Sequence, residues 1–288
     1  MKKTAQLKNL VFAKEILVMP GIYDGVSAVI AEKLGFKALC LGGYAASASL
    51  LGKPDISLLT LTEMTNHLRN ITEVTDIPVL ADGDTGYGSI LNVIRTVREF
   101  EKAGAGGLFI EDQVFPKRCG HMEGKQVIPA EDMVSKIKAA LDTRIDEDMI
   151  IMARTDAYAV YGLDEAIRRA NLYHEAGADM IFIEAPTTSD EMKRLNQAVS
   201  APSLANMVEG GKTPLRTAKE LEDMGYSVAV FPVSAIYAAA KSVWNLLKLL
   251  SETGTTQGYE ESMFCFDEFN ELVNLRQYRK IESGYAAP

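Results

Sequence analysis

Short apolar segments alternate with longer helical patterns along most of the chain. Eight of the apolar segments show no regular polar alternation, which is typical of strands buried on both faces. They lie at residues 16–20, 38–43, 77–84, 106–112, 149–156, 180–186, 202–207 and 227–232. Helical patterns at 22–35, 90–104 and 163–177 end at Gly35, Gly104 and Gly177, the residue type that commonly follows the last turn of a helix.

Eight strands that alternate with helices predict a (β/α)8 barrel of the TIM type. An open, doubly wound sheet is the alternative. The count of eight and the absence of an early G-x-G-x-x-G after a strand favour the barrel. We expect residues 1–250 to form the barrel and 251–288 a C-terminal helical extension of the same domain. Its helical tail, 261–283, has enough apolar residues to be buried on another subunit.

Composition narrows the classes of partner. The 288 residues carry a net charge of −9, which disfavours binding to nucleic acid or to an anionic membrane surface. No apolar run reaches the ~18 residues of a membrane span, and the N-terminal segment does not resemble a signal peptide. The three cysteines are widely spaced and show no disulfide or zinc pattern, so we expect a cytoplasmic protein.

Acidic residues stand at the ends of two predicted strands, where barrel enzymes place their active sites. Asp82 and Asp84 follow the third apolar segment, and Glu111 ends the fourth. Because side chains at i and i+2 of a strand point the same way, Asp82 and Asp84 are expected to converge. Three such carboxylates suit Mg²⁺, which prefers oxygen ligands. The alternative is that they cap helices or pair with lysines.

The next strand ends are also polar. Arg154 ends the fifth apolar segment, Glu184 the sixth and Asn206 the seventh. An arginine opposite a metal site is suited to bidentate capture of a substrate carboxylate. The alternative is an ion pair with Glu184 or Asp156, and both descriptions can hold together.

The segment after the fourth strand, residues 113–129, is long for a loop of this kind and is expected to act as a lid. It contains Cys119 among four cationic or titratable side chains, and nearby positive charge favours a reactive thiolate. These neighbours are Lys117, Arg118, His121 and Lys125.

The other cysteines and histidines are expected to have no chemical role. We expect Cys40 and Cys265 to be buried and inert, and His67 and His174, which fall on helical patterns, to be structural or exposed.

Taken together, these segments resemble the isocitrate lyase/phosphoenolpyruvate mutase superfamily. The matching segments occur in family order over nearly the whole chain, and KRCGH after EDQ resembles the Cys-bearing, carbon–carbon lyase branch. They are LGG (41–43), ADGDTGYG (81–88), IEDQ (110–113), KRCGH (117–121), ARTDA (153–157), EAP (184–186) and the segment 206–211.

The resemblance implies a barrel whose C-terminal helices swap between subunits, usually in a homotetramer. It also implies Mg²⁺, with Mn²⁺ as a substitute, on Asp82, Asp84 and Glu111, largely through waters. Cys119 would be the acid/base, with Lys117, His121 and Glu184 as the other catalytic residues. The implied substrate contacts are Gly42, Gly43, Tyr44, Asp55, Gly120, Arg154, Asn206, Gly210, Gly211 and Tyr237.

Two departures from the 2-methylisocitrate-cleaving members concern substrate size. Tyr237 and Phe266 stand where those members are expected to carry arginines for a tricarboxylate. A third carboxylate would then be buried without a partner, which costs several kcal/mol. The resemblance is greatest to the members that cleave alkylmalates, and it implies Mg²⁺-dependent cleavage of a C4 2-hydroxydicarboxylate, 2,3-dimethylmalate, to pyruvate and propionate. The alternatives are 2-methylisocitrate cleavage, oxaloacetate hydrolysis, carboxyphosphonoenolpyruvate mutation and, remotely, a barrel that binds a dicarboxylate without turnover.

Overall fold

The computed structural model describes residues 1–120 and 122–285, so the expectation for His121 lies outside the described residues. The chain divides into two compact units, residues 1–235 and residues from 236 onward. The division falls within helix α11 (Ser234–Thr253), before the expected start of the extension at 251.

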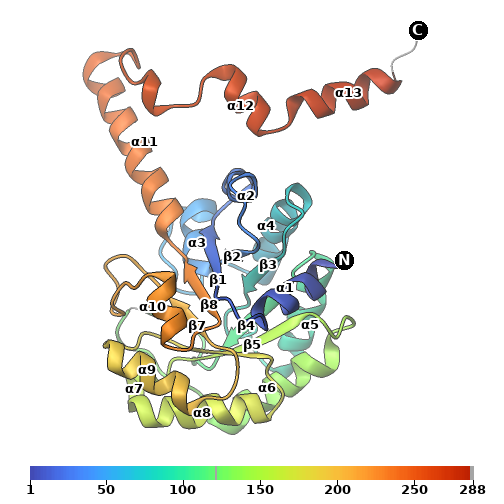
Figure 1. Ribbon diagram of the computed structural model, residues 1–288, viewed down its shortest axis with the longest axis vertical. Helices are drawn as coiled ribbons and strands as arrows, with labels where there is room; N and C mark the ends of the chain where they lie inside the picture. The colour runs from blue at the N-terminus through green and yellow to red at the C-terminus, as the bar shows by residue number, and fades with distance from the viewer. Residues whose placement is uncertain (121, 286–288) are drawn as a thin grey trace. The chain divides into compact units, whose positions relative to one another are not determined.

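The first unit is built on eight parallel strands (Figure 1). Their order is β6-β5-β4-β3-β2-β1-β8-β7, and a parallel bridge between Ile181 and Ser203 links the two outer strands, β6 and β7. The sheet is therefore a nearly closed barrel, as predicted, and the open doubly wound sheet is excluded. The strands are β1 (Leu17–Ile22), β2 (Leu39–Leu41), β3 (Val79–Asp82), β4 (Gly107–Glu111), β5 (Ile150–Thr155), β6 (Met180–Ile183), β7 (Leu204–Asn206) and β8 (Val228–Phe231).

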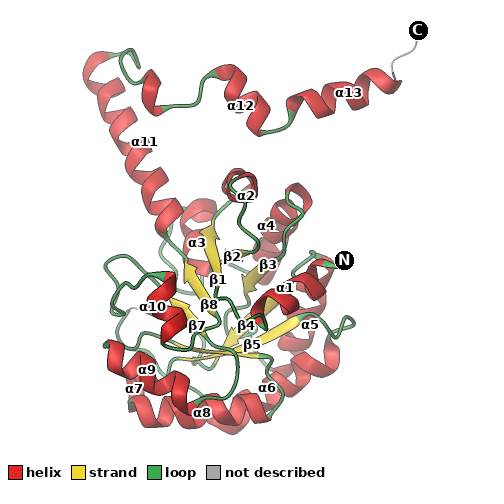
Figure 2. Cartoon of the chain, in the orientation of Figure 1, coloured by secondary structure: helices red, strands yellow, loops and turns green. Residues whose placement is uncertain are grey.

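Helices surround these strands (Figure 2). Gly35, Gly104 and Gly177 follow α2, α5 and α8 with φ of +87°, +85° and +108°, so the predicted helix ends are confirmed. None of the described helices combines the length and the apolar character needed to cross a bilayer. The helices that lie wholly within this unit are α1 (Lys3–Val11), α2 (Gly25–Lys33), α3 (Gly43–Leu51), α4 (Leu61–Val74), α5 (Ile90–Lys102), α6 (Ala130–Thr143), α7 (Tyr158–Tyr161), α8 (Leu163–Glu175), α9 (Ser189–Ala198) and α10 (Ala218–Asp223).

Two apolar clusters explain why the strands lack polar alternation. One cluster joins strand residues such as Ala81 and Ile110 to the surrounding helices. The other contains the alternate strand residues, such as Leu80 and Phe109, together with Leu7 from α1. Each strand is thus buried on both faces, with one face toward the helices and one toward the barrel interior.

The second unit contains the rest of α11, a short 3₁₀ helix (Glu260–Ser262), α12 (Phe266–Leu272) and α13 (Leu275–Tyr285). The helical tail predicted over 261–283 is therefore interrupted, because Asn274, with φ of +59°, separates α12 from α13. The prediction that Cys265 is buried was wrong: it is exposed at the N-terminus of α12, where its backbone N–H donates to Glu268.

Candidate active site

The polar residues at the strand ends face the barrel interior because they continue its alternating pattern. Asp82 lies two residues after the interior Leu80, and Glu111 two residues after Phe109. In the same way Arg154, Glu184 and Asn206 follow Met152, Phe182 and Leu204. Adjacent strands therefore present five polar side chains to one end of the barrel.

Asp84 reaches the same place by a different route. Strand β3 ends at Asp82, and Asp84 has a left-handed φ of +50°, so strand alternation does not account for its direction. Its backbone N–H instead donates to Oδ1 of Asp82 at 2.9 Å. Oδ2 of Asp82 accepts the backbone N–H of Gly43, at the start of α3, at 2.9 Å. A turn, rather than the strand, therefore brings the two carboxylates together. The Gly43 N–H, which was expected to contact the substrate, donates to Asp82 within the protein.

Lys117 supplies a positive charge beside the acidic cluster of Asp82, Asp84 and Glu111. Its Nζ lies 2.8 Å from Oδ1 of Asp84 and 2.9 Å from Oδ2 of Asp55, and its side chain is 2% exposed. Burial by itself would lower the pKa of Lys117, but the surrounding carboxylates outweigh burial and raise it well above its usual value. Burial raises the pKa of Asp84 to about 6, although the nearby ammonium of Lys117 opposes this shift.

Glu111 is a buried carboxylate whose charge is not offset by hydrogen bonds from the described residues. It is fully buried, and neither of its side-chain oxygens accepts a hydrogen bond from the described residues, although Nε of Arg154 lies 3.2 Å from Oε2. Burial raises the pKa of Glu111 well above its ordinary value, and Arg154 offsets this only in part. Buried carboxylate oxygens without hydrogen bonds suit a cation or its bound waters.

The cluster fits a divalent ion held partly through water. Among the described residues no three acidic, His or Cys side chains converge closely enough to hold one ion. Direct contact of one ion with all three carboxylates is therefore not expected, and the expected contact, largely through waters, stays a prediction. Mg²⁺ commonly keeps several waters and binds through one or two carboxylates, so Glu111, Asp82 and Asp84 are suitable residues.

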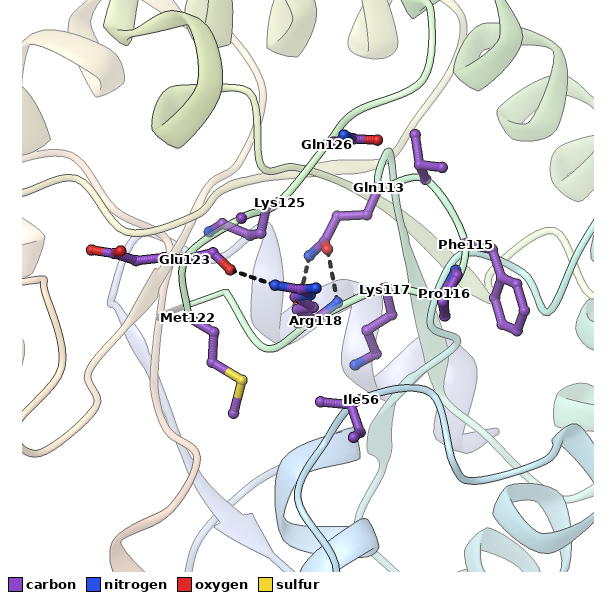
Figure 3. Close-up of a pocket in the computed structure, with 12 residues that line it drawn as sticks. Ile56, Gln113, Phe115, Pro116, Lys117, Arg118, Met122, Glu123, Lys125 and Gln126 are labelled. Atoms are coloured by element: carbon purple, nitrogen blue, oxygen red, sulfur yellow. Dashed lines mark hydrogen bonds between the residues drawn. The ribbon is translucent and has the colours of Figure 1, made fainter.

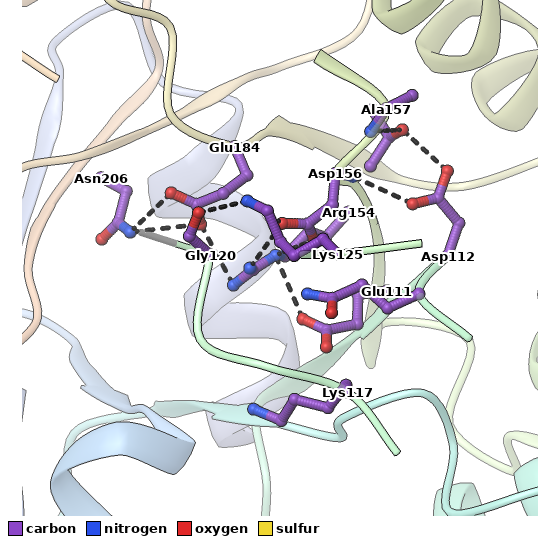
Figure 4. Close-up of polar contacts among 12 residues, drawn as sticks. Glu111, Asp112, Lys117, Gly120, Lys125, Arg154, Asp156, Ala157, Glu184 and Asn206 are labelled. Atoms are coloured by element: carbon purple, nitrogen blue, oxygen red, sulfur yellow. Dashed lines mark hydrogen bonds and ion pairs between the residues drawn. The ribbon is translucent and has the colours of Figure 1, made fainter. Parts of the chain in front are cut away.

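Arg154 stands at the centre of a second group of charges (Figure 4). Its guanidinium donates to both oxygens of Asp156, at 2.9 and 3.1 Å, and Nη1 lies 3.1 Å from Oε2 of Glu184. It also lies over the ring of Phe182, 5.0 Å from the centroid. The side-chain amide of Asn206 donates to Glu184 at 3.4 Å. Both predicted ion pairs of Arg154 are present, and they fix the plane of its guanidinium.

A buried network behind Arg154 was missed by the sequence reasoning. Asp112 accepts from Thr155 Oγ1 at 2.7 Å, from the Asp156 backbone at 2.9 Å, from Tyr173 at 2.8 Å and from Arg169 at 3.0 Å. The signal in the sequence was Arg169 and Tyr173, polar residues four apart on the apolar face of α8.

The β4–α6 loop, residues 112–129, is tied at its base and folded over a cavity (Figure 3). Gln113 pairs with Val127 in an antiparallel bridge, and its side-chain amide holds both the N–H and the carbonyl of Arg118. The cavity has a volume of about 660 Å³ and is lined by Ile56 and by residues 113–118 and 122–126. The described part of the predicted lid, residues 113–120 and 122–129, therefore has polar contacts of its own.

Cys119 is half-buried in this loop, and the next residue touches the Arg154 group. A Cβ built on Gly120 would lie 2.4 Å from Cγ of Glu184 and 2.5 Å from Nη2 of Arg154. Lys125 donates to the Gly120 carbonyl and lies 3.0 Å from Asp156. The ammonium groups of Lys117 and Lys125, expected to surround the thiol, are thus engaged by carboxylates.

Other predicted site residues are less closely joined to this arrangement. Gly210 and Gly211 lie in the loop after β7, where the Gly211 N–H donates to Val208. Tyr44 lies in α3, after Gly42 at its N-terminus, and Tyr237 belongs to the second unit. Their roles in substrate binding stay predictions.

Cys40, His67 and His174, which were expected to have no chemical role, lie as predicted. Burial raises the pKa of Cys40 to about 12. A ring nitrogen of His67 lies 2.8 Å from the Tyr23 carbonyl, and one of His174 lies 3.0 Å from the Ala178 carbonyl, so both histidines are structural.

Comparison with known proteins places this arrangement in context. A family model described as phosphoenolpyruvate phosphomutase matches residues 7–250. The 2,3-dimethylmalate lyase of Eubacterium barkeri is 48% identical over 286 residues, which cover 99% of each chain. A crystal structure of 2,3-dimethylmalate lyase matches with a TM-score of 0.94 and 32% identity, over 100% of this chain and 96% of that one. Phosphonopyruvate hydrolase in complex with oxalate and Mg²⁺ matches with a TM-score of 0.90 and 28% identity, over 99% of each chain.

Proposed function

The chain belongs to the phosphoenolpyruvate phosphomutase family, and we propose that it is a carbon–carbon lyase that cleaves 2,3-dimethylmalate to pyruvate and propionate. The observation that carries the proposal is the approach of the Cys119–Gly120 segment to Arg154 and Glu184. It supports a thiol-bearing loop that acts beside Arg154, a cation suited to binding a carboxylate, with an acidic, metal-suited cluster at the same end of the barrel.

Metal dependence is part of the proposal. The support is the oxygen-rich cluster of Glu111, Asp82 and Asp84 and the Mg²⁺ complex of the related phosphonopyruvate hydrolase. A bound Mg²⁺ would supply positive charge that favours loss of the C2 hydroxyl proton. We expect Mn²⁺, which also accepts oxygen ligands, to replace it.

The chain's own residues perform the remaining steps. Arg154, whose guanidinium is held in one orientation by Asp156 and Glu184, orients a carboxylate of the substrate. As the C2–C3 bond breaks, the C2 hydroxyl proton passes to a carboxylate of the acidic cluster and the C2 oxygen becomes the keto oxygen of pyruvate. The electron pair left at C3 is held as the enediolate of propionate. The charges of Arg154 and Lys117 stabilise this dianion in a site from which the loop excludes water. Cys119 then donates its thiol proton to C3.

Substrate size is expected to depend on Tyr237 and Phe266, which we propose replace the arginines that a tricarboxylate substrate would need. Removing one methyl group from the substrate should weaken binding by about 0.8 kcal/mol, or roughly fourfold. Adding a third carboxylate should cost far more, because its charge would lose water without gaining a partner.

Assembly and compartment complete the proposal. Phe264, Phe266 and Phe269 are 58%, 83% and 43% exposed in the chain, an unusual density for a solvated helical segment. We propose that the second unit packs on a neighbouring copy in a homotetramer. The reaction needs Cys119 as a free thiol, which a reducing cytoplasm maintains.

A coupled assay for pyruvate tests the function. We expect 2,3-dimethylmalate to exceed malate, and 2-methylisocitrate and oxaloacetate to be nearly inert. Cys119→Ser should lower kcat on the order of 10²-fold, whereas the matched control Cys265→Ser, which changes an exposed cysteine, should keep activity. Cleavage of 2-methylisocitrate at or above the rate for 2,3-dimethylmalate would contradict the proposed substrate.

A further inference from the structure

We infer that Lys125 is a positioning residue, which holds the Cys119–Gly120 segment over Arg154 by bridging the Gly120 carbonyl and Asp156. The inference rests on the proposed function, because it is the role of Cys119 that gives the position of this segment its importance. It adds a residue that acts through Cys119 rather than on the substrate.

The contacts of Lys125 join two parts of the site. Its Nζ donates to the Gly120 carbonyl and, at 3.0 Å, to Oδ1 of Asp156, and its side chain is 2% exposed. The same Oδ1 accepts Nη2 of Arg154 at 3.1 Å, while Oδ2 accepts Nε at 2.9 Å. One carboxylate therefore orients both the loop and the guanidinium (Figure 4).

A lysine suits this position for a physical reason. Its ammonium has three donors and no fixed plane, so it can serve two acceptors that lie on different segments of the chain. Some polar contacts of the loop, such as Gln113 to Arg118 and Arg118 to Glu123, begin and end within the loop (Figure 3). Lys117 joins the loop to Asp55 and Asp84 on one side of the site, whereas Lys125 joins it to Asp156, directly after β5, on the side of Arg154.

Removal of this ammonium should loosen the loop without unfolding the barrel. Asp156 keeps both bonds to Arg154 and its backbone bond to Asp112, so its charge stays compensated. The Gly120 carbonyl, by contrast, loses its buried donor. The favoured response is movement of the Cys119–Gly120 segment toward water, where that carbonyl can be hydrated.

The test is the alkylation rate of Cys119 by iodoacetamide in a Cys265→Ser background, in which Cys40 is buried with a pKa of about 12 and is unreactive. Lys125→Met should raise the rate at least about tenfold and lower kcat by a similar factor. The rate is followed across a pH series, so that a change in access is separated from a change in thiolate fraction. Lys125→Arg should restore part of the protection.

Arg118→Met is the matched control, because it removes a cation of the same loop whose contact, to the Glu123 carbonyl, stays within the loop. An unchanged alkylation rate in Lys125→Met, or an equal rise in Arg118→Met, would overturn the inference. So would additive effects of Lys125→Met and Asp156→Asn, since residues that act through one contact are not additive.

The two proposals can fail separately. If Cys119→Ser keeps full turnover, the proposed function is wrong, but the alkylation rates of the Lys125 variants still measure the position of the loop. If Cys119→Ser is inactive and Lys125→Met protects Cys119 as the wild type does, only the role of Lys125 is wrong.

Discussion

Gly120→Ala is expected to reduce kcat/KM about a hundredfold while leaving the barrel folded. The added Cβ would lie 2.4 Å from Cγ of Glu184 and 2.5 Å from Nη2 of Arg154. Carbon atoms in contact normally lie about 3.5–4.0 Å apart, so either the loop or these side chains must move by about 1 Å. The backbone of Gly120 is not left-handed, so the effect of alanine is steric rather than conformational.

The two neighbours have little freedom to move. Glu184 is 1% exposed and pairs with Arg154, which is itself held by both oxygens of Asp156. The loop is the part that can retreat, because one of its sides faces solvent. A displacement of about 1 Å at a reacting group can cost on the order of 10²-fold in rate, which corresponds to roughly 2.7 kcal/mol.

The assay is pyruvate release from 2,3-dimethylmalate, with thermal unfolding measured on the same preparations. Gly25→Ala is the matched control, because its Cβ would meet Val74 at an ordinary 3.4 Å, and it should keep full activity. Wild-type kcat/KM in Gly120→Ala would refute the closed position of the loop. A loss of stability as large as that of a core substitution would show that the change acts on the fold instead.

Three further expectations concern the metal, the pH response and assembly. Glu111→Gln should lower activity at least about a hundredfold and remove any shift in melting temperature caused by Mg²⁺; EDTA-treated protein that is fully active without added metal would contradict the metal site. Burial would raise the pKa of Asp156, but Arg154 and Lys125 outweigh burial and lower it from 3.8 to about 2. The ionised carboxylate therefore stabilises the fold above about pH 4, and this contribution is lost as the pH falls toward 2. The stability gap between wild type and Asp156→Asn in urea should therefore be constant above about pH 4 and shrink by about 2 kcal/mol below it, and a gap that already shrinks near pH 6 would refute the assignment. Light scattering at micromolar concentration should give a tetramer, and a monomer would show that the exposed apolar residues of the second unit have another purpose.

The barrel and much of its polar end were predictable from the sequence because they depend on neighbours along the chain. Apolar segments buried on both faces, together with helices that end at Gly35, Gly104 and Gly177, are local signals of the repeating strand–helix unit. Once a strand is placed, alternation directs Asp82 and Arg154 into the barrel interior, since each follows an interior apolar residue by two positions.

Where the local pattern is weak, predictions from the sequence were wrong. The burial of Cys265 was inferred from the usual behaviour of its residue type, yet its place at the start of a short helix leaves it exposed. Asp84 was expected to follow strand alternation, but a turn with φ of +50° directs its side chain.

The tertiary structure alone decided the partners of the two lysines of the β4–α6 loop. Lys117 and Asp55 are 62 positions apart in sequence and Lys125 and Asp156 are 31 apart, so each pair forms only when the barrel brings their segments together. Two of the cations expected from the sequence to surround Cys119, Lys117 and Lys125, therefore pair with carboxylates, because an unpaired ammonium is costly in a buried site. Composition specifies that Lys117 and Lys125 are present, whereas barrel closure determines the carboxylate with which each one pairs.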